Sequence, residues 1–167
     1  SKGALPFSAS KNRAVREDPM KSKDQWLEPE IQRLLDETRI PVRLSCNGSS
    51  GCPVLASLWY LPEDGRLWCA TQRSANVAKL LARDSQCAFE VSVESMPYRG
   101  VRGQGLATLH DDRGEEILLK LLDRYLGDSK SQLARSLLAQ VATETAIAIE
   151  PKTIFSWDYT ERMTGGA

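Results

Sequence analysis

Six short segments of this chain show the period-two alternation of β-strands, and turn residues separate most of them. The predicted strands span residues 42–46, 52–61, 66–71, 86–94, 101–110 and 146–149. Connections as short as those between the first three strands join antiparallel neighbours, because a parallel pair needs a crossover of a dozen or more residues. The second strand is apolar on both faces, which predicts a hairpin with a buried second arm. The whole pattern favours an antiparallel sheet that closes on itself, a small α+β barrel.

The remaining segments have helical spacing. The predicted helices lie within residues 27–35, 73–84 and 114–143. Pro41 ends the first helix, and Gly127 with Asp128 divides the last into two helical stretches. We expect the helices to pack outside the sheet, and the last strand to continue through Pro151 toward Trp157.

The two ends of the chain differ from its middle. Residues 1–25 carry six basic and three acidic side chains without hydrophobic periodicity, which is typical of a flexible arm. Residues 26–160 are predicted to form one domain, a size at which a hydrophobic core is stable without disulfides or metals. Residues 161–167 form a C-terminal tail.

Charge and hydropathy restrict the partners. Twenty-two Lys and Arg balance twenty-two Asp and Glu, so the chain lacks the basic excess needed to bind nucleic acid. The longest nearly unbroken apolar stretch, residues 54–61, is far shorter than the roughly 18 residues of a membrane-spanning helix. The N-terminal region has no apolar core of a signal peptide. We therefore expect a cytoplasmic protein without a membrane partner.

The four cysteines do not have the spacing of a zinc site. Cys46, Cys52, Cys69 and Cys87 include no Cys-x-x-Cys pair and no histidine at ligand spacing. Cys46 and Cys52 flank a predicted turn, where a disulfide is geometrically possible. Reduced, buried thiols are the alternative, and both remain open at this point.

Residues 71–76 combine hydroxyl, amide and guanidinium groups where a buried strand meets a helix start. Helix N-termini present free N–H groups and a partial positive charge, so anions bind there readily. Arg73 and Lys79 add full charges, which favours a phosphate site. The alternative is an ordinary helix cap by Ser74 or Asn76 with a solvated arginine.

The segment 98–107 is unusually rich in glycine for a strand. Gly103, Gly105 and Ala107 fall on one face. Glycine weakens a strand unless something approaches the backbone closely. A flat ring or a neighbouring subunit is one interpretation, and tight curvature of the sheet is the other.

No catalytic side chain is predicted. His110 is the only histidine, which argues against a Ser-His-Asp or Cys-His arrangement. The acidic pair Glu115 and Glu116 lies at a helix start, where negative charge suits the helix dipole.

Taken in order, these features resemble the pyridoxamine 5'-phosphate oxidase-like superfamily, the split β-barrel oxidoreductases that use flavins or deazaflavins. The similarity spans residues 31–157 and depends on the strand at 53–61, the turn at Asp64 and Gly65, the strand-to-helix junction, and residues 99–107. It implies a six-stranded antiparallel split β-barrel with outer helices. It also implies a homodimer whose cofactor lies in a groove between the subunits.

The resemblance assigns the cofactor-binding residues. Ser57 and Leu58 border the isoalloxazine ring, and Arg99 or Arg102 reaches in from the partner subunit. Thr71, Arg73, Ser74 and Asn76 lie near the phosphate. Lys79 and Trp157 complete the predicted set.

Two departures from the family pattern shape the functional prediction. Val77 stands where many members have a lysine, and no histidine follows His110, so the vitamin B6 reaction is not expected. The leading prediction is an FMN-dependent oxidoreductase acting on a small organic substrate. The alternatives are an F420-dependent reductase of the same fold and a dimeric binding protein without a cofactor. The lone histidine disfavours haem.

Overall fold

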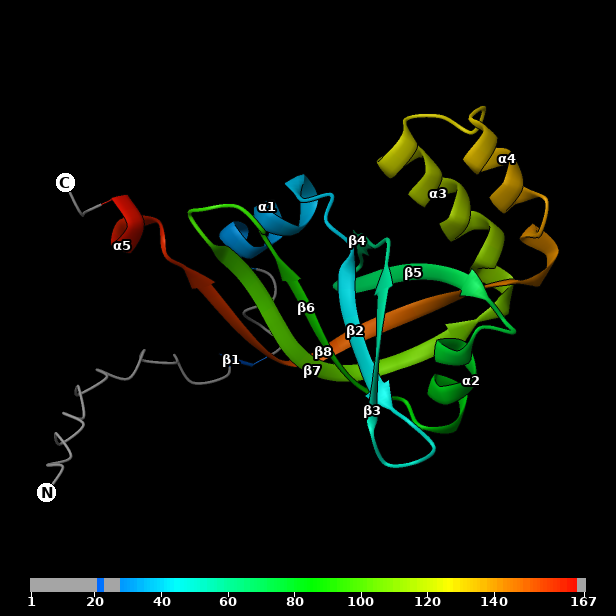
Figure 1. Ribbon diagram of the computed structural model, residues 1–167, viewed down its shortest axis with the longest axis horizontal. Helices are drawn as coiled ribbons and strands as arrows, with labels where there is room; N and C mark the ends of the chain where they lie inside the picture. The colour runs from blue at the N-terminus through cyan, green and yellow to red at the C-terminus, as the bar shows by residue number, and fades with distance from the viewer. Residues whose placement is uncertain (1–20, 23–27, 165–167) are drawn as a thin grey trace, which may run out of the picture.

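One antiparallel sheet, curled into a half-barrel, organises the residues that the computed structural model describes, 21–22 and 28–164 (Figure 1). The strand order is β3-β2-β6-β7-β8-β5-β4, and β1 pairs with β8. The strands are β1 (Lys21–Ser22), β2 (Val42–Asn47), β3 (Pro53–Leu58), β4 (Leu61–Glu63), β5 (Arg66–Gln72), β6 (Gln86–Ser92), β7 (Arg99–His110) and β8 (Glu144–Asp158). The predicted antiparallel α+β half-barrel is confirmed, with two short strands, β1 and β4, in addition to the six expected.

The predicted strand at residues 52–61 is divided into β3 and β4. Tyr60, between them, is fully buried, and its hydroxyl donates to the carbonyl of Leu35 at 2.8 Å. The inward turn of this side chain interrupts the strand. The prediction of a buried second arm was also wrong, because β3 is an edge strand whose residues are all exposed or half-buried.

The core occupies the inner face of the half-barrel. Apolar side chains of β2, β5, β6, β7 and β8 meet there, among them Leu44, Leu67, Phe89, Val101 and Ile147. The helices α1 (Pro29–Glu37) and α2 (Asn76–Arg83) bury their apolar faces in the same core. Burial of such side chains stabilises the fold by roughly 1.5–3 kcal/mol each.

A second layer covers the outer face of β5 and β8. It consists of α3 (Gly114–Leu126) and α4 (Gln132–Leu138), which stand together on one side of the sheet in Figure 1. Gly127 ends α3 with a φ of 76°, which explains the predicted interruption of the helical segment there. The short helix α5 (Thr160–Thr164) follows β8.

The glycines of β7 allow the sheet to bend. A Cβ on Gly103 would lie 2.2 Å from the carbonyl oxygen of Thr153, and one on Gly105 would lie 2.2 Å from that of Glu150. The register with β8 shifts between Gln104 and Gly105. Of the two interpretations of these glycines, tight curvature is therefore the correct one, since the neighbouring strand of the same chain fills the space.

The four cysteines are free thiols. Cys46 lies opposite Val54 on one side and Cys87 on the other, whereas Cys52 is exposed in the turn before β3. The hairpin register therefore does not bring Cys46 and Cys52 face to face.

The predicted arm, residues 1–25, falls mostly outside the described residues. Lys21 and Ser22 pair with Ile154 and Thr153 of β8, so this part of the arm adds to the sheet. The domain boundaries themselves stay predictions. Within residues 21–22 and 28–164, no helix combines the length and apolar character needed to cross a bilayer.

Candidate functional site

The β5–α2 corner, residues 71–76, connects the end of β5 to the start of α2. Ala75 occupies the N-cap position, and no side chain caps the helix. Ser74 and Asn76 are exposed beside this helix end, and Lys79 follows one turn later. The first-turn N–H groups of α2, two polar side chains and a lysine thus form a donor set that suits a phosphate.

The helix-cap alternative predicts that Arg73 is solvated, but its guanidinium is bonded to the protein. Its Nη2 donates to the carbonyl of Ala142 at 2.6 Å, and its Nε donates to that of Thr143 at 3.4 Å. Its Nη1 lies 3.7 Å from a carboxylate oxygen of Asp111. The guanidinium is therefore held beside the corner, where its charge is partly balanced by an exposed aspartate.

Thr71 faces Thr145 across the β5–β8 pairing. Thr145 is fully buried, and its Oγ1 has no hydrogen-bond partner among the described residues. A buried hydroxyl without a partner costs roughly 1–3 kcal/mol. The pairing of β5 with β8 therefore leaves one buried hydroxyl without a hydrogen-bond partner next to Thr71.

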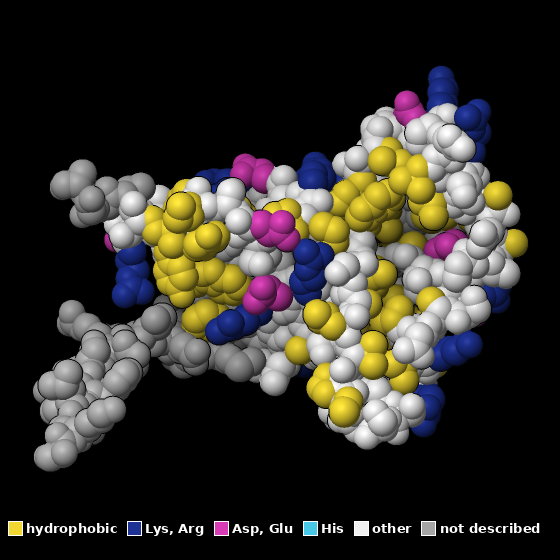
Figure 2. Space-filling view, viewed as in Figure 1, with side chains coloured by type: hydrophobic (Ala, Val, Ile, Leu, Met, Phe, Trp, Pro, Cys, Tyr) yellow, Lys and Arg dark blue, Asp and Glu magenta, His cyan; other side chains and the backbone are white. Residues whose placement is uncertain are grey.

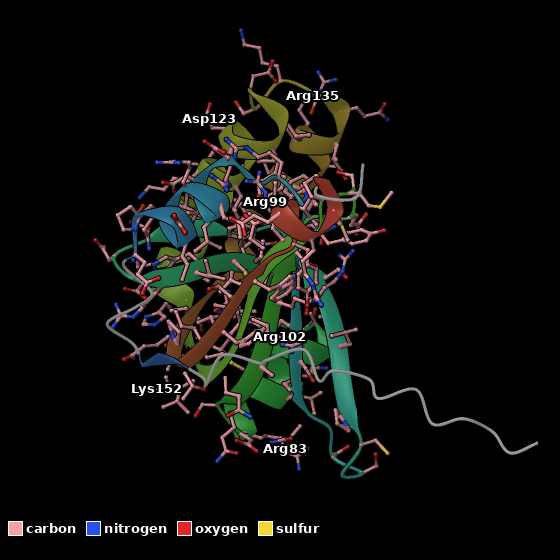
Figure 3. All side chains as sticks on the ribbon, turned by 90° about the vertical axis from the view of Figure 1, so that its left-hand side faces the viewer. Arg83, Arg99, Arg102, Asp123, Arg135 and Lys152 are labelled. Atoms are coloured by element: carbon pink, nitrogen blue, oxygen red, sulfur yellow. The ribbon has the colours of Figure 1, made fainter. Side chains whose placement is uncertain are left out.

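Arg99, Arg102 and Trp157 form a second group on β7 and β8. The Arg102 guanidinium lies 4.9 Å from the ring centroid of Phe155 and 5.4 Å from that of Trp157. Figure 3 shows Arg102 midway along the face formed by β7 and β8, and Arg99 near α5. This group combines a cation with two half-buried aromatic rings, an arrangement that can hold a planar, charged ligand.

The two groups lie far apart within one chain. Thr71 pairs with Thr145, whereas Arg102 pairs with Phe155, ten residues further along β8. Ten residues of strand measure about 30 Å. A single subunit therefore does not bring Arg102 to the β5–α2 corner.

Ser57 and Leu58 lie on the edge strand β3. Ser57 is exposed, and Leu58 is half-buried against the inner core. Figure 2 shows a hollow over β5, between the α3–α4 pair and β3, with apolar side chains on both sides. Of the two predicted ring-binding residues, Ser57 is accessible, whereas Leu58 packs toward the core.

The sequence analysis did not assign Trp59 and Tyr125 to the candidate site. Their rings stack with centroids 4.9 Å apart and an angle of 8° between planes. The stack joins the connection between β3 and β4 to α3, and both rings pack against the buried cluster that includes Trp68 and Ile117. Only the break in the strand at residues 59–60 places Trp59 there, and the local alternation gives no sign of that break.

Gln72 and Glu144 were also missed. Glu144 is only 6% exposed, and its carboxylate accepts a hydrogen bond from the Gln72 side-chain amide. Burial raises the pKa of Glu144 above its usual range, and the bond from Gln72 partly offsets this increase. Gln72 lies within the predicted segment 71–76, but Glu144 becomes its neighbour only through the pairing of β5 with β8, so no local motif links the two residues.

His110 lies outside the β5–α2 corner. It ends β7, shares a 2.9 Å hydrogen bond with Thr108, and tilts against Trp68 with ring centroids 5.3 Å apart. In the part of the chain that the structure describes, no three His, Cys, Asp or Glu side chains cluster in a way that could hold a metal ion.

Comparisons with known proteins identify the fold. No family model matches the sequence, and no curated protein matches it. A solved structure of a conserved hypothetical protein from Mycobacterium tuberculosis has a TM-score of 0.70 and 23% identity, covering 81% of this chain and 87% of that one. An F420 reductase has a TM-score of 0.61 and 21% identity, covering 72% and 92% respectively.

A third similar structure comes from Clostridium acetobutylicum. It is a protein related to general stress protein 26, of the pyridoxinephosphate oxidase family, with a TM-score of 0.58 and 17% identity over 83% of this chain and 91% of that one. These likenesses confirm the resemblance at the level of the fold. The chain has the split-barrel fold of the pyridoxamine 5'-phosphate oxidase-like proteins.

Proposed function

We propose that this chain binds FMN and acts as an oxidoreductase on a small organic substrate. The observation that carries the proposal is the β5–α2 corner, where the start of α2 has no side-chain cap and the polar side chains of Ser74 and Asn76 are exposed beside it. Phosphate is one of the anions that such a donor set binds. Arg73 and Lys79 raise the local positive potential.

F420 is the second candidate cofactor. It also carries a phosphate, and one of the similar structures is an F420 reductase. Either cofactor would supply the hydride or electron transfer when bound. The residues of this chain would bind the phosphate, orient the ring beside Ser57 and Leu58, and exclude water.

We further propose a homodimer. Arg102 and Trp157 lie about 30 Å of strand away from the β5–α2 corner, so they reach a shared cofactor only from a second copy. The edge strand β3 has no charged residue, and Leu55 on it is 68% exposed. An exposed apolar edge of this kind is a template for pairing with another chain.

The first experiment is the visible absorption spectrum of the purified protein, with mass analysis of any compound that heat releases. FMN or F420 in the released fraction, or titration of the protein with either one to saturation, supports the proposal. A colourless protein that binds neither cofactor contradicts it and favours a dimeric binding protein.

Arg73→Ala tests the corner directly. Loss of a charge-assisted contact should weaken FMN binding by roughly 1.5–3 kcal/mol and riboflavin binding much less, because riboflavin lacks the phosphate. Arg83→Ala is the matched control, since Arg83 lies at the opposite end of α2, as Figure 3 shows. An unchanged FMN affinity in Arg73→Ala removes Arg73 from the site.

The dimer is tested by light scattering after size-exclusion chromatography. The expected mass is twice the 18.5 kDa of the chain. Leu55→Asp should shift the protein toward monomer and weaken cofactor binding in parallel. A wild-type monomer that binds FMN contradicts the shared site.

A further inference from the structure

The side chain of Gln72 is fully used inside the protein. Its Nε2 donates to the carbonyl of Gln140 at 3.1 Å and to the carboxylate of Glu144, and its Oε1 accepts from the hydroxyl of Thr143. All three partners belong to residues 140–144, which connect α4 to β8. Gln72 therefore bonds the end of β5 to a segment about seventy residues later in the chain.

The backbone of the β5–α2 corner follows the same segment. The N–H of Arg73 donates to the carbonyl of Thr143 at 2.9 Å, and the N–H of Ala75 donates to the carbonyl of Gln72 at 2.9 Å. The Thr143 hydroxyl also lies 3.0 Å from the carbonyl of Gln140, so its single proton is shared between that carbonyl and Oε1 of Gln72. The turn that precedes α2 is thus held against residues 140–144 by the backbone of Arg73 as well as by the side chain of Gln72.

A carboxamide is the side chain that satisfies these partners. Thr143 presents a donor, whereas Glu144 and the carbonyl of Gln140 present acceptors, so the side chain between them must donate and accept at once. A glutamate at position 72 would face the buried carboxylate of Glu144. A leucine would leave that carboxylate without its amide donor.

We propose that Gln72 is a positioning residue: it fixes the β5–α2 corner on residues 140–144, so that Ser74, Asn76 and the first N–H groups of α2 converge on a phosphate. The inference rests on the proposed function and extends it, because it makes residues 140–144, the segment that follows α4, a determinant of phosphate affinity. This segment acts on the anion site through its bonds to Gln72.

The experiment compares wild type with Gln72→Leu. One measurement is hydrogen–deuterium exchange of the amides of residues 73–78 in the ligand-free protein. The other is the ratio of the dissociation constants for FMN and riboflavin, measured by flavin fluorescence. In the variant we expect faster exchange at residues 73–78, about tenfold weaker FMN binding, and riboflavin binding within about twofold of wild type.

A swapped pair gives the rescue that distinguishes positioning from general stability. Gln72→Glu alone should weaken FMN binding by at least as much as Gln72→Leu. Combined with Glu144→Gln, it restores an amide donor opposite a carboxylate and should recover part of the FMN affinity, because the carboxylate introduced at position 72 still cannot donate to the carbonyl of Gln140. Gln132→Leu, an exposed glutamine on α4, is the matched control and should leave both affinities unchanged.

Several results would overturn the inference: unchanged exchange at residues 73–78, unchanged FMN affinity, or an equal loss of FMN and riboflavin binding in Gln72→Leu. If this variant does not fold, Thr143→Val removes a single bond to Gln72, and a loss of about threefold in FMN alone is expected. If the wild type binds neither FMN nor F420, the proposed function fails. The exchange data on the ligand-free protein then decide alone whether Gln72 holds the corner.

Discussion

Residues 144–149 of β8 pair with β5 on one edge, and residues 146–149 also pair with β7 on the other. All six residues are buried. Residues 151–158 pair with β7 on one edge, while on the other edge only β1 is paired among the described residues. The first half uses small and aliphatic side chains, whereas the second carries Phe155 and Trp157 half-exposed. We call residues 144–149 the closed half of β8 and residues 151–158 its open half. The outer face of the open half can accept a partner.

The two halves also differ in their part of the candidate site. The closed half supports the β5–α2 corner through Thr145 and Glu144. The open half presents Phe155 and Trp157 to Arg102. Substitutions should therefore affect mainly stability in the first half and mainly binding in the second.

The largest difference in unfolding free energy is expected between the variants Ile147→Ala and Phe155→Ala. Ile147 is fully buried in the inner core, so its truncation should lower the free energy of unfolding by about 3 kcal/mol. Phe155 is only half-buried, and its truncation should cost about 1 kcal/mol. Urea denaturation measures both. Equal losses would show that the open half is as closely packed as the other.

Gly105→Ala tests the bend at the junction of the halves. The added Cβ would meet the carbonyl oxygen of Glu150 at 2.2 Å, and backbone on both sides cannot move away easily. We expect a loss of roughly 2–3 kcal/mol in unfolding free energy. Gln104→Ala, at the exposed neighbouring position, is the control and should change stability little. A stable Gly105→Ala variant would mean that the bend does not depend on this glycine.

Apolar runs in the sequence predict β8 and β3 unequally well. Residues 146–149 are a continuous apolar run, and the continuation through Pro151 toward Trp157 is confirmed by the extent of β8, Glu144–Asp158. The same kind of apolar run misleads at β3, which is an edge strand instead of a buried arm. Alternation reports which side chains are apolar, but the pairing of distant strands decides which of them are covered.

The candidate site shows the same division. The β5–α2 corner is contiguous, so its hydroxyls, amide and arginine can be found in the sequence as a group. Gln72 and Glu144 are brought together only by strand pairing, and Arg102 is separated from the corner by the length of β8. Local chemistry was therefore predictable, whereas the supports of the corner and the distance between the two groups needed the fold.

Arg102→Leu should separate binding from stability in the open half. The cation–aromatic contacts with Phe155 and Trp157 contribute roughly 0.5–1 kcal/mol at a partly exposed site, so the loss of unfolding free energy should stay below about 1 kcal/mol. FMN or F420 binding should fall by about tenfold or more if Arg102 reaches the cofactor of a second subunit. Lys152→Leu, on the same half of β8, is the control. Equal cofactor affinity in Arg102→Leu and wild type would restrict the site to one subunit.

Glu144→Gln should produce the smallest effect, and one that depends on pH. Burial raises the pKa of Glu144 in the folded protein, so the folded state binds this proton more tightly than the unfolded state does. The stability linked to this group is therefore fully present below the unfolded pKa of a glutamate and is lost as pH rises through the raised folded pKa.

Glutamine still accepts the bond from Gln72 but never ionises. The variant should match wild type in acid and exceed its unfolding free energy by less than about 1 kcal/mol at neutral pH, as thermal denaturation across the pH range can measure. Glu115→Gln, an exposed carboxylate on α3, controls for the loss of one negative charge. The opposite result is that Glu144→Gln is less stable than wild type at neutral pH but not in acid. It would show that the ionised carboxylate and its bond to Gln72 outweigh the cost of burial.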